Sequence, residues 1–359
     1  MSDEKPRIAF AMGDPAGISP EIAAKLLALT AVREAAEVVV FGDRRVLEAG
    51  ARVAGSPLDI EVYSSPDEIR RTGGKPVLID LKSLDPAKVA LGKATEAGGQ
   101  FAIRNFRAAL QYAGAGKATA VFFTPFNKRA MRLADPSYDD EINFVRAALK
   151  NTGPASEFNV LDGLWNARVT SHIPLSKVAS SISGEAIVRG LALTDASMRA
   201  AGFAKPRIAV AALNPHAGDG GNFGREEIDI IEPAVRAGIE KGFAVEGPFP
   251  ADTVFLRAKG GQFDAVLTMY HDQGQIAMKL MGFHRGVTVQ GGLPVVVTTP
   301  AHGTAFDIAG QNRADPGAMI GAYRMAVSMA ANTALSPTKA AISRPAEPNS
   351  IGPSRLFRG

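Results

Sequence analysis

The stretch RIAFAMGDPAGISPE, residues 7–21, decides the fold class of this chain. Its first part, Arg7–Met12, is apolar and typical of a buried β-strand. Ser19 is the expected N-cap of a helix, Pro20 its first helical residue and Glu21 an acid in its first turn. A strand that passes through a short glycine-containing loop into a helix is the repeating unit of α/β proteins.

The rest of the chain repeats this alternation of β-rich runs and helical patterns, which predicts an α/β protein with largely parallel strands. The expected strands are Arg7–Met12, Glu37–Phe41, Pro76–Ile79, Ala118–Phe123, Arg207–Ala211, Ala265–Met269 and Val287–Val289. Further helices are expected at Arg225–Gly242 and from about Pro316 to Leu335. The apolar face of the first of these carries Ile228, Ile231, Val235 and Ile239.

Composition narrows the class of protein. At 359 residues the chain is too long for one ordinary core and is expected to form two domains. Its net charge is +4 without a basic run interleaved with aromatic residues, so no nucleic-acid partner is expected. The absence of cysteine excludes disulfides and thiolate chemistry. No signal-peptide pattern and no run of about 18 apolar residues occurs, so we expect no membrane contact and a cytoplasmic location.

Three of the five histidines follow expected strands, in loops that contain glycine or proline. They are His172 in the sequence SHIP, His216 in NPHAG and His271 in YHDQG. Imidazoles at strand ends are ready ligands for a divalent metal, and three of them leave one coordination position open for catalysis. Each could equally be a hydrogen-bonded loop histidine, and the residues alone leave both interpretations open.

Two glycine-containing loops join an expected strand to an expected helix. The loop from Gly13 to Glu21 presents N–H groups and a helix N-terminus to an anion or polar ligand, or is simply a tight turn. It lacks the GxGxxG spacing of a dinucleotide fingerprint. The loop from Asn214 to Glu226 lacks the Gly-Lys-Ser/Thr ending of a phosphate loop, so nucleotide hydrolysis is not expected.

Two lysines and one further segment complete the candidate features. Lys128 lies just past a strand end, and Lys279 lies downstream of His271. Each is either a solvated surface charge or a group that binds substrate or transfers protons in a cleft. In HGTAFDIAG, residues 302–310, small residues beside a histidine and an aspartate would let the backbone approach a flat polar ligand such as adenosine.

Together these segments resemble the 4-hydroxythreonine-4-phosphate dehydrogenase family. The matching motifs occur in order between Gly13 and Pro316 and read GDPAGISPE, TPFNK, SHIPL, NPHAG, PADT, YHDQG and HGTAFDIAG. The last motif is also similar to the dinucleotide-binding segment of isopropylmalate and isocitrate dehydrogenases, which share the fold.

The resemblance implies a two-domain isocitrate/isopropylmalate dehydrogenase-like α/β fold, with mostly parallel sheets and flanking helices. It also implies a homodimer with the active site in the cleft between domains. Residues 1–125 and 290–335 would form the cofactor-side domain, and residues 126–289 the substrate, metal and dimerisation domain. Residues 336–359, rich in Ser, Pro and Ala, are expected to form a surface or mobile tail.

The resemblance further implies that NAD or NADP is bound without a Rossmann fingerprint. The residues expected to bind it are Gly13, Asp14, His302, Gly303, Thr304, Ala305, Asp307 and Asp315. His172, His216 and His271 would bind one divalent metal, with ligands drawn from both subunits. Zinc is expected first, and cobalt, nickel, iron or magnesium are the other candidates.

The expected chemistry is oxidation of a metal-polarised alcohol with hydride transfer to the nicotinamide. Lys279 is the first candidate for contacting an anionic group of the substrate or for proton transfer, and Lys128 is the second. Asp252 and Asp272 are candidates for orienting the groups of the site, although aspartates beside histidines also cap turns.

Departures from the family pattern concern the phosphate of the substrate. Members carry Gly-His-Thr-Glu where this chain has YDDE, so Asp139 and Asp140 stand at substrate positions. The family's phosphate-contacting asparagine falls at Thr288 and its arginine at Val297. Because phosphate is held by charge-assisted bonds, these residues predict weak binding of a phosphomonoester. The counter-interpretation is an anion site relocated to Lys128, Arg129, Arg132 or Arg285.

The sequence therefore predicts a metal-dependent, NAD(P)-linked dehydrogenase of a secondary alcohol, with a decarboxylation where the substrate permits it. The predicted substrate is an unphosphorylated hydroxy acid or a cis-dihydrodiol carboxylate. The alternative is the same enzyme type acting on 4-hydroxythreonine 4-phosphate in pyridoxal phosphate synthesis. A third hypothesis is a catalytically silent homologue that binds a small ligand, against which the retention of all three histidines speaks.

Overall fold

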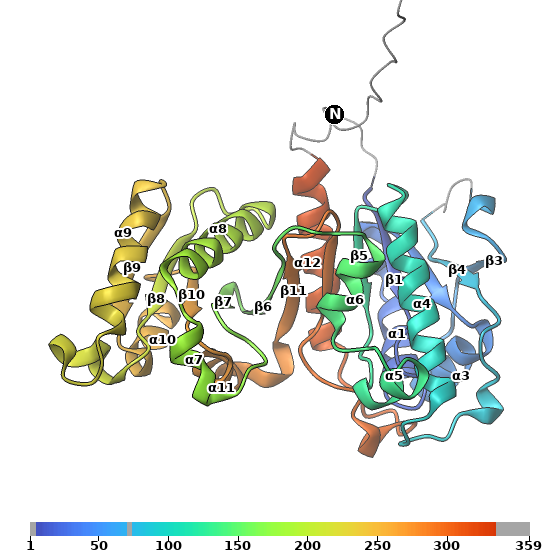
Figure 1. Cartoon of the computed structure of the whole chain (residues 1–359). Coiled ribbons are helices and arrows are strands. Elements are labelled where there is room, and N and C mark those ends of the chain that lie inside the picture. Colours follow the sequence, from blue (N-terminus) through green and yellow to red (C-terminus); the bar gives the residue numbers. More distant parts are fainter. Residues whose placement is uncertain (1–4, 70–73, 335–359) are drawn as a thin grey trace, which may run out of the picture.

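The structure is a computed structural model and describes residues 5–69 and 74–334. Its strands are β1 (Arg7–Ala11), β2 (Glu37–Gly42), β3 (Glu61–Tyr63), β4 (Val77–Asp80), β5 (Ala120–Phe123), β6 (Ser156–Leu161), β7 (Leu164–Arg168), β8 (Arg207–Ala211), β9 (Ala244–Phe249), β10 (Ala265–Thr268), β11 (Val287–Gly291) and β12 (Val296–Pro300). They form one sheet in the order β3-β4-β2-β1-β5-β12-β11-β6-β7-β10-β8-β9 (Figure 1).

Helices cover both faces of this sheet. The α-helices are α1 (Ser19–Leu27), α2 (Thr30–Ala35), α3 (Arg44–Ala54), α4 (Glu96–Gly114), α5 (Lys128–Ala134), α6 (Glu141–Ala148), α7 (Val178–Ser181), α8 (Gly184–Ala200), α9 (Glu232–Glu240), α10 (Ala251–Lys259), α11 (His271–Gly282) and α12 (Gly317–Ala334). The 3₁₀-helical segments are η1 (Pro66–Glu68), η2 (Pro86–Lys88), η3 (Leu175–Lys177), η4 (Pro215–Gly221), η6 (Phe283–Arg285) and η7 (Phe306–Ile308), and η5 (Glu227–Ile231) is π-helical.

The sheet consists of two halves with mainly parallel strands, which meet at a centre of antiparallel strands. The pairs β12–β11, β11–β6 and β6–β7 are antiparallel, and every other neighbouring pair is parallel. The strands of the first half are β1 to β5 with β12, and those of the second half are β6 to β11. The expected α/β class with a largely parallel sheet is confirmed.

Alternating side chains of each strand enter opposite core layers. Ile8 and Phe10 pack in the layer under α1, α3 and α12, whereas Ala9 and Ala11 pack under α4, α5 and α6. Both faces of β1 are therefore buried, which explains why its sequence is continuously apolar rather than alternating. In the second half, the neighbouring residues Val210 and Ala211 likewise pack in two different core layers.

The expected strands correspond to β1, β2, β4, β5, β8, β10 and β11, but two helix details were wrong. Ile18 is the N-cap of α1, and the Ser19 hydroxyl instead donates to the Pro125 carbonyl at 2.9 Å. The expected helix at 225–242 is a π-helical turn, η5, followed by α9. On the expected apolar face, Ile231 and Val235 are buried, whereas Ile228 and Ile239 are exposed.

The β6–β7 hairpin was not anticipated. Its turn is Asp162-Gly163, with φ of 48° and 88°. Two central residues with positive φ are typical of a type I′ turn, for which Asp-Gly is a strong sequence signal. The hairpin starts the antiparallel centre of the sheet and carries residues that face the candidate site.

Helices α5 and α6 pack against the first half of the molecule, although their residues fall in the range expected for the second domain. The Phe106 ring of α4 stacks on Phe144 of α6, with ring centroids 5.4 Å apart. Helix α12 contributes to core layers of both halves, with Tyr323 in one and Met329 in the other. The expected tail, 336–359, lies outside the described residues. No helix in the described ranges is long and apolar enough to cross a membrane.

Candidate active site

His172 and His271 come together at one edge of the second half. They follow β7 and β10, which are adjacent parallel strands whose carboxyl ends therefore lie side by side. Their ring centroids are 5.6 Å apart. His271 begins α11, and its Nδ1 lies 2.7 Å from Asp272 Oδ1. Asp272 is thus in contact with this histidine, as expected of an orienting group.

His216 follows β8, the strand beyond β10, and does not complete this pair within one chain. Its ring centroid lies 6.2 Å from that of Phe223. Among the described residues, no three His, Cys, Asp or Glu side chains are close enough to hold a metal ion. One chain therefore brings together two of the three expected ligands.

Gln273 links the chain segments that carry His216 and His271. Its Oε1 accepts from the Met269 amide at 2.7 Å, and its Nε2 donates to the Ala212 carbonyl at 2.6 Å. These contacts hold the ends of β10 and β8 at a set spacing. The motif YHDQG contained this glutamine, but sequence reasoning did not assign it a role.

The first half contributes Asp140 and Lys128 to the same edge. Asp140 is the N-cap of α6, accepting from the Asn143 amide at 2.9 Å, and its Oδ2 lies 3.7 Å from His172 Nδ1. Lys128 Nζ lies 3.3 Å from Glu141 Oε2. Asp139 is exposed and accepts from the Asn143 side chain at 2.8 Å. Asp140, rather than Asp139, therefore faces the histidines.

A buried polar network continues from this edge across the sheet. Arg168 donates to Asn159 Oδ1 at 2.8 Å, Glu157 Oε2 at 3.1 Å and Ser171 Oγ at 3.0 Å. Asn159 in turn donates to Thr288 Oγ1 at 3.4 Å, so the expected substrate residue Thr288 belongs to the network.

Burial raises the pKa of the Glu157 carboxyl, against the opposing effect of Arg168 and with further contributions from Glu141 and Asp140. Sequence reasoning missed Glu157, Asn159 and Arg168. A polar residue in a strand does not reveal from its position in the sequence that its strand borders a cleft.

Lys279 is exposed on α11 and borders a small cavity of about 30 Å³. Asn159 and Gln275 line this cavity from the second half, and Ala301 lines it from the segment that leads into the HGTAFDIAG loop. The expected catalytic lysine thus borders a cavity that reaches Ala301, the residue before the expected cofactor loop. Asp252, by contrast, is an exposed residue in the first turn of α10.

Val297 does not line a cleft, contrary to expectation. Its side chain is 0% exposed and packs in the core layer that contains Phe123, Phe126 and Val145. The residue lies in β12, between β5 and β11, so its neighbours are other strands and the helices that cover them. The prediction from sequence compared residue types at this position and could not detect its burial.

The two expected cofactor loops are in direct contact. They follow β1 and β12, which flank β5 in parallel, so both loops emerge at the same edge. The Ile18 amide donates to the Thr304 carbonyl at 3.0 Å. A Cβ on Gly17 would lie 2.4 Å from that carbonyl oxygen, so only glycine permits this approach. Gly13 donates its amide to Thr124 Oγ1 at 2.7 Å.

Two buried polar atoms at these loops have no hydrogen-bond partner among the described residues. They are Asp14 Oδ2 and His302 Nε2. The other Asp14 oxygen accepts from the Ala16 amide at 2.8 Å, and burial raises the pKa of this carboxyl to about 6. Buried polar atoms without partners are rare in folded proteins and point to a missing ligand or water.

An apolar cavity of about 220 Å³ adjoins the same loops. Its walls come from α1, α3 and the loop ends, and include Pro15, Gly17, Val46, Leu91 and Gly310. Of the other expected cofactor residues, Asp307 is exposed in η7, and Asp315 accepts from the Gly317 amide at 2.8 Å as α12 begins. Gly303 and Ala305 lie in the same loop, Ala305 with φ of 41°.

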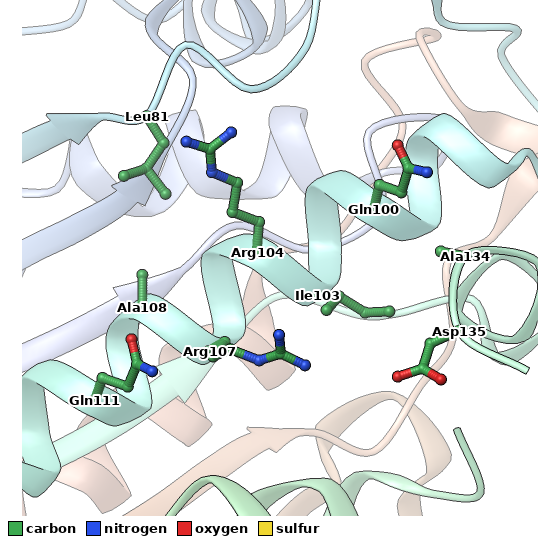
Figure 2. Close-up of a pocket in the computed structure, with 9 residues that line it drawn as sticks. All are labelled: Leu81, Gln100, Ile103, Arg104, Arg107, Ala108, Gln111, Ala134 and Asp135. Atoms are coloured by element: carbon green, nitrogen blue, oxygen red, sulfur yellow. The ribbon is translucent and has the colours of Figure 1, made fainter. Parts of the chain in front are cut away.

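A wider cavity of about 440 Å³ lies over the outer side of α4 (Figure 2). In it Arg104 points toward Leu81, and Arg107 points toward the side of Asp135. Its lining comes from α4, the end of β4 and the end of α5. These are neither the histidine loops nor the cofactor loops, so we do not assign the chemistry to this cavity.

Comparison with known proteins matches residues 34–326 to the family model described as "Pyridoxal phosphate biosynthetic protein PdxA". The chain belongs to the PdxA family. A relative from Rhizobium meliloti, named "Putative 4-hydroxythreonine-4-phosphate dehydrogenase 2", is 61% identical over 92% of this chain and 94% of its own length. The D-threonate 4-phosphate dehydrogenase of Cupriavidus necator is 39% identical over 93% of this chain and 100% of its own.

Two solved structures of similar proteins match the fold over most of this chain. The 4-hydroxythreonine-4-phosphate dehydrogenase from Klebsiella pneumoniae has a TM-score of 0.78 and 36% identity, covering 91% of this chain and 100% of its own. The terephthalate 1,2-cis-dihydrodiol dehydrogenase from Burkholderia xenovorans has a TM-score of 0.62 and 29% identity, covering 90% and 98%. These relatives carry names of oxidoreductases that act on CH–OH groups.

Proposed function

We propose that this PdxA-family protein oxidises a secondary alcohol of a small hydroxy acid with NAD or NADP. The observation that carries the proposal is the pairing of His172 and His271 beside Asp140. A second observation is the cavity that Lys279 shares with Ala301, the residue before the cofactor loop. These features support a metal site, an anion-binding group and a cofactor loop that act on one substrate.

The histidine pair fits a divalent metal. Two imidazoles on one tetrahedral ion have ring centroids roughly 5 Å apart, given metal–nitrogen bonds of about 2.0–2.1 Å. The observed 5.6 Å is close to this spacing. Asp272 contacts Nδ1 of His271 and so leaves Nε2 as the metal ligand. A divalent ion held there would lower the pKa of the substrate alcohol and stabilise the developing alkoxide.

We propose that His216 of a second copy supplies the third ligand in a homodimer. Within one chain no third ligating side chain joins the pair among the described residues. Helix α11, which His271 begins, carries Ile276 and Leu280 four residues apart, and Leu280 is 83% exposed. Leu175 on η3, close in sequence to His172, is also exposed. An apolar surface beside an incomplete site favours a partner subunit as its cover.

The cofactor is expected at the contact between the Gly13–Glu21 and 302–310 loops. The apolar cavity of about 220 Å³ would take the adenine ring, and the unpartnered His302 Nε2 and Asp14 Oδ2 are polar atoms that a bound ligand would satisfy. Hydride leaves the carbinol carbon for the nicotinamide, and the hydroxyl proton is lost to solvent or to a basic group. The products are a ketone and the reduced cofactor.

The names of the relatives favour a phosphorylated substrate, which the sequence had ranked second. Both 4-hydroxythreonine 4-phosphate and D-threonate 4-phosphate are four-carbon hydroxy acids with a terminal phosphate. Lys279 and Lys128 are the candidate cations for such a group. The other basic candidates are Arg285, which is paired with Asp162, and Arg132, which donates to the Tyr138 and Asp139 carbonyls. Lys128 itself lies 3.3 Å from Glu141 Oε2.

An unphosphorylated substrate is the second candidate, and the structure of one position favours it. The Asp140 carboxylate lies 3.7 Å from His172 Nδ1, and its negative charge disfavours a dianion at the histidines.

The test is formation of reduced cofactor, followed by absorbance, with each phosphorylated acid and its unphosphorylated counterpart. A cis-dihydrodiol carboxylate is included, and every reaction is run with NAD and NADP and with or without a chelator. We expect turnover that the chelator abolishes and that His172→Ala and His271→Ala remove. His284→Ala is the control, because His284 is exposed on η6 outside the two loops.

The preference between substrates decides between the two candidates. A kcat/KM at least about 100-fold higher for a phosphorylated acid would exclude the hypothesis of an unphosphorylated substrate, since that ratio corresponds to about 2.7 kcal/mol of phosphate recognition. A kcat/KM higher by the same factor for an unphosphorylated acid would exclude a phosphorylated substrate. No turnover of any substrate by protein that has bound metal and cofactor would contradict both and leave the silent ligand-binding homologue.

A further inference from the structure

The chain around His216 adopts an unusual backbone conformation. From His216 to Gly220 every residue has positive φ, with values of 53°, 54°, 80°, 44° and 65°. His216, Ala217 and Asp219 are not glycines, and each such residue costs about 1–2 kcal/mol relative to a right-handed conformation. A conformation of this kind persists only where surrounding contacts enforce it.

Glu227 holds the chain that leads into this segment. Its side chain lies at the start of η5, and the residue is 1% exposed. Oε1 accepts from the backbone amides of Leu213 at 2.9 Å and Asn214 at 2.8 Å. Oε2 accepts from the Asn214 side chain at 2.9 Å.

The carboxylate also packs closely against the left-handed turn. A Cβ on Gly218 would lie 2.7 Å from Glu227 Oε2, so the acid occupies the inside of the turn. A buried carboxylate that accepts amide hydrogens makes stronger bonds than a neutral acceptor would. The two backbone amides that it binds, those of Leu213 and Asn214, precede His216 by three residues and by two. Pro215, which lies between Asn214 and His216, has a fixed φ angle.

We propose that Glu227 is the positioning residue that orients His216 for metal binding. This inference rests on the proposed metal-dependent function. Glu227 holds the Leu213 and Asn214 amides by hydrogen bonds. Gln273 holds the carbonyl of Ala212, the residue just before them, by a further hydrogen bond. Together they set the direction in which the chain leaves β8. The imidazole then reaches the partner's histidine pair without a search of loop conformations, which raises metal affinity by preorganisation.

The test compares Co²⁺ binding by three variants of the full-length protein. Glu227→Met removes both acceptor oxygens at nearly constant shape. Glu227→Gln keeps one oxygen for the two backbone amides and is the conservative rescue. Glu226→Met is the matched control, because Glu226 accepts a hydrogen bond from the Asn214 side chain at 2.7 Å but from neither backbone amide that Glu227 binds, and it is not fully buried.

We expect Glu227→Met to weaken Co²⁺ binding at least about tenfold in competition with a chelator, the usual effect of losing a partner behind a metal ligand. Its Co²⁺ absorption spectrum should change as the histidine set changes. Glu227→Gln and Glu226→Met should stay within about threefold of the wild-type affinity. If Glu227→Met does not fold, Glu227→Asp takes its place, since the shorter acid cannot reach both amides.

Three outcomes separate the inference from the function on which it rests. Wild-type affinity and spectrum in folded Glu227→Met or Glu227→Asp would overturn the role of Glu227. Equal losses in Glu226→Met and Glu227→Met would also overturn it, because the effect would then be a general one of loop acidity. A wild-type protein that binds no Co²⁺, or binds it equally well as His216→Ala, would instead contradict the proposed metal site.

Discussion

The Asp14 carboxyl illustrates how a single buried group couples stability to pH. Burial raises its pKa to about 6 in the folded chain, against an ordinary value of 3.8. Between these two pH values the folded state holds a proton that the unfolded state has released. The free energy of unfolding therefore falls as pH rises from about 4 to 6, by about 3 kcal/mol in all, and stays reduced above that window.

Replacing Asp14 by Asn should remove this cost, because the amide is neutral and its oxygen can still accept from Ala16. Without cofactor, we expect the free energy of unfolding at pH 7.5 to rise by about 2 kcal/mol, with little change at pH 4. Urea denaturation at both pH values measures it, with Asp252→Asn as the exposed control. An equal shift at both pH values would show that the charge of Asp14 is not the cause.

At the level of elements, the contact between α4 and α5 holds the Lys128 segment against the first half. A Cβ on Gly99 of α4 would lie 1.9 Å from the Ala130 carbonyl oxygen and 2.9 Å from the Ala134 Cβ. The two helices can approach this closely only because the residue is glycine. Near the other end of α4, Gly114 faces only a Leu149 methyl group, at 3.1 Å.

Gly99→Ala should therefore separate α4 from α5 and lower the free energy of unfolding by about 3 kcal/mol. Gly114→Ala makes the same chemical change, but its neighbour can move and alanine favours the helix, so we expect a change within about 1 kcal/mol. Thermal or urea denaturation distinguishes them. Similar losses in both variants would mean that the close helix contact does not limit this position.

For the whole molecule, the separation of His216 from the His172–His271 pair predicts a site shared between two subunits. His216→Ala and His271→Ala should each be inactive. In a mixed dimer, one site would lose both ligands and the other would keep all three. Mixing the variants in equal amounts should restore about a quarter of the wild-type activity, since half of the dimers are mixed and each has one intact site.

The measurement is turnover after the two variants are unfolded and refolded together, compared with each refolded alone. His172→Ala mixed with His271→Ala is the control and should remain inactive, because both residues belong to the same site. Activity in that control, or none in the His216→Ala and His271→Ala mixture, would contradict a site built from the pair of one chain and His216 of the other.

The sequence by itself determined the local units and the chemistry that their loops carry. Apolar runs such as Arg7–Met12 and the Gly- and Pro-containing loops after them depend on neighbouring residues only. They therefore indicated β1, β2, β4, β5, β8, β10 and β11 and the strand-end positions of His216 and His271 correctly, although β7, which precedes His172, was not among the expected strands. The motif order also identified the family, because those loop residues stand in the same succession in this chain as in the family pattern.

Only the tertiary structure decided which strand ends meet and which side chains face the cleft. It showed the antiparallel centre around β6 and β11, the buried Arg168 network, and Val297 inside the core. It also separated His216 from the other two histidines. These features arise from pairing between strands that are distant in the chain. A residue's own neighbours in sequence cannot specify which distant strand or helix will cover it.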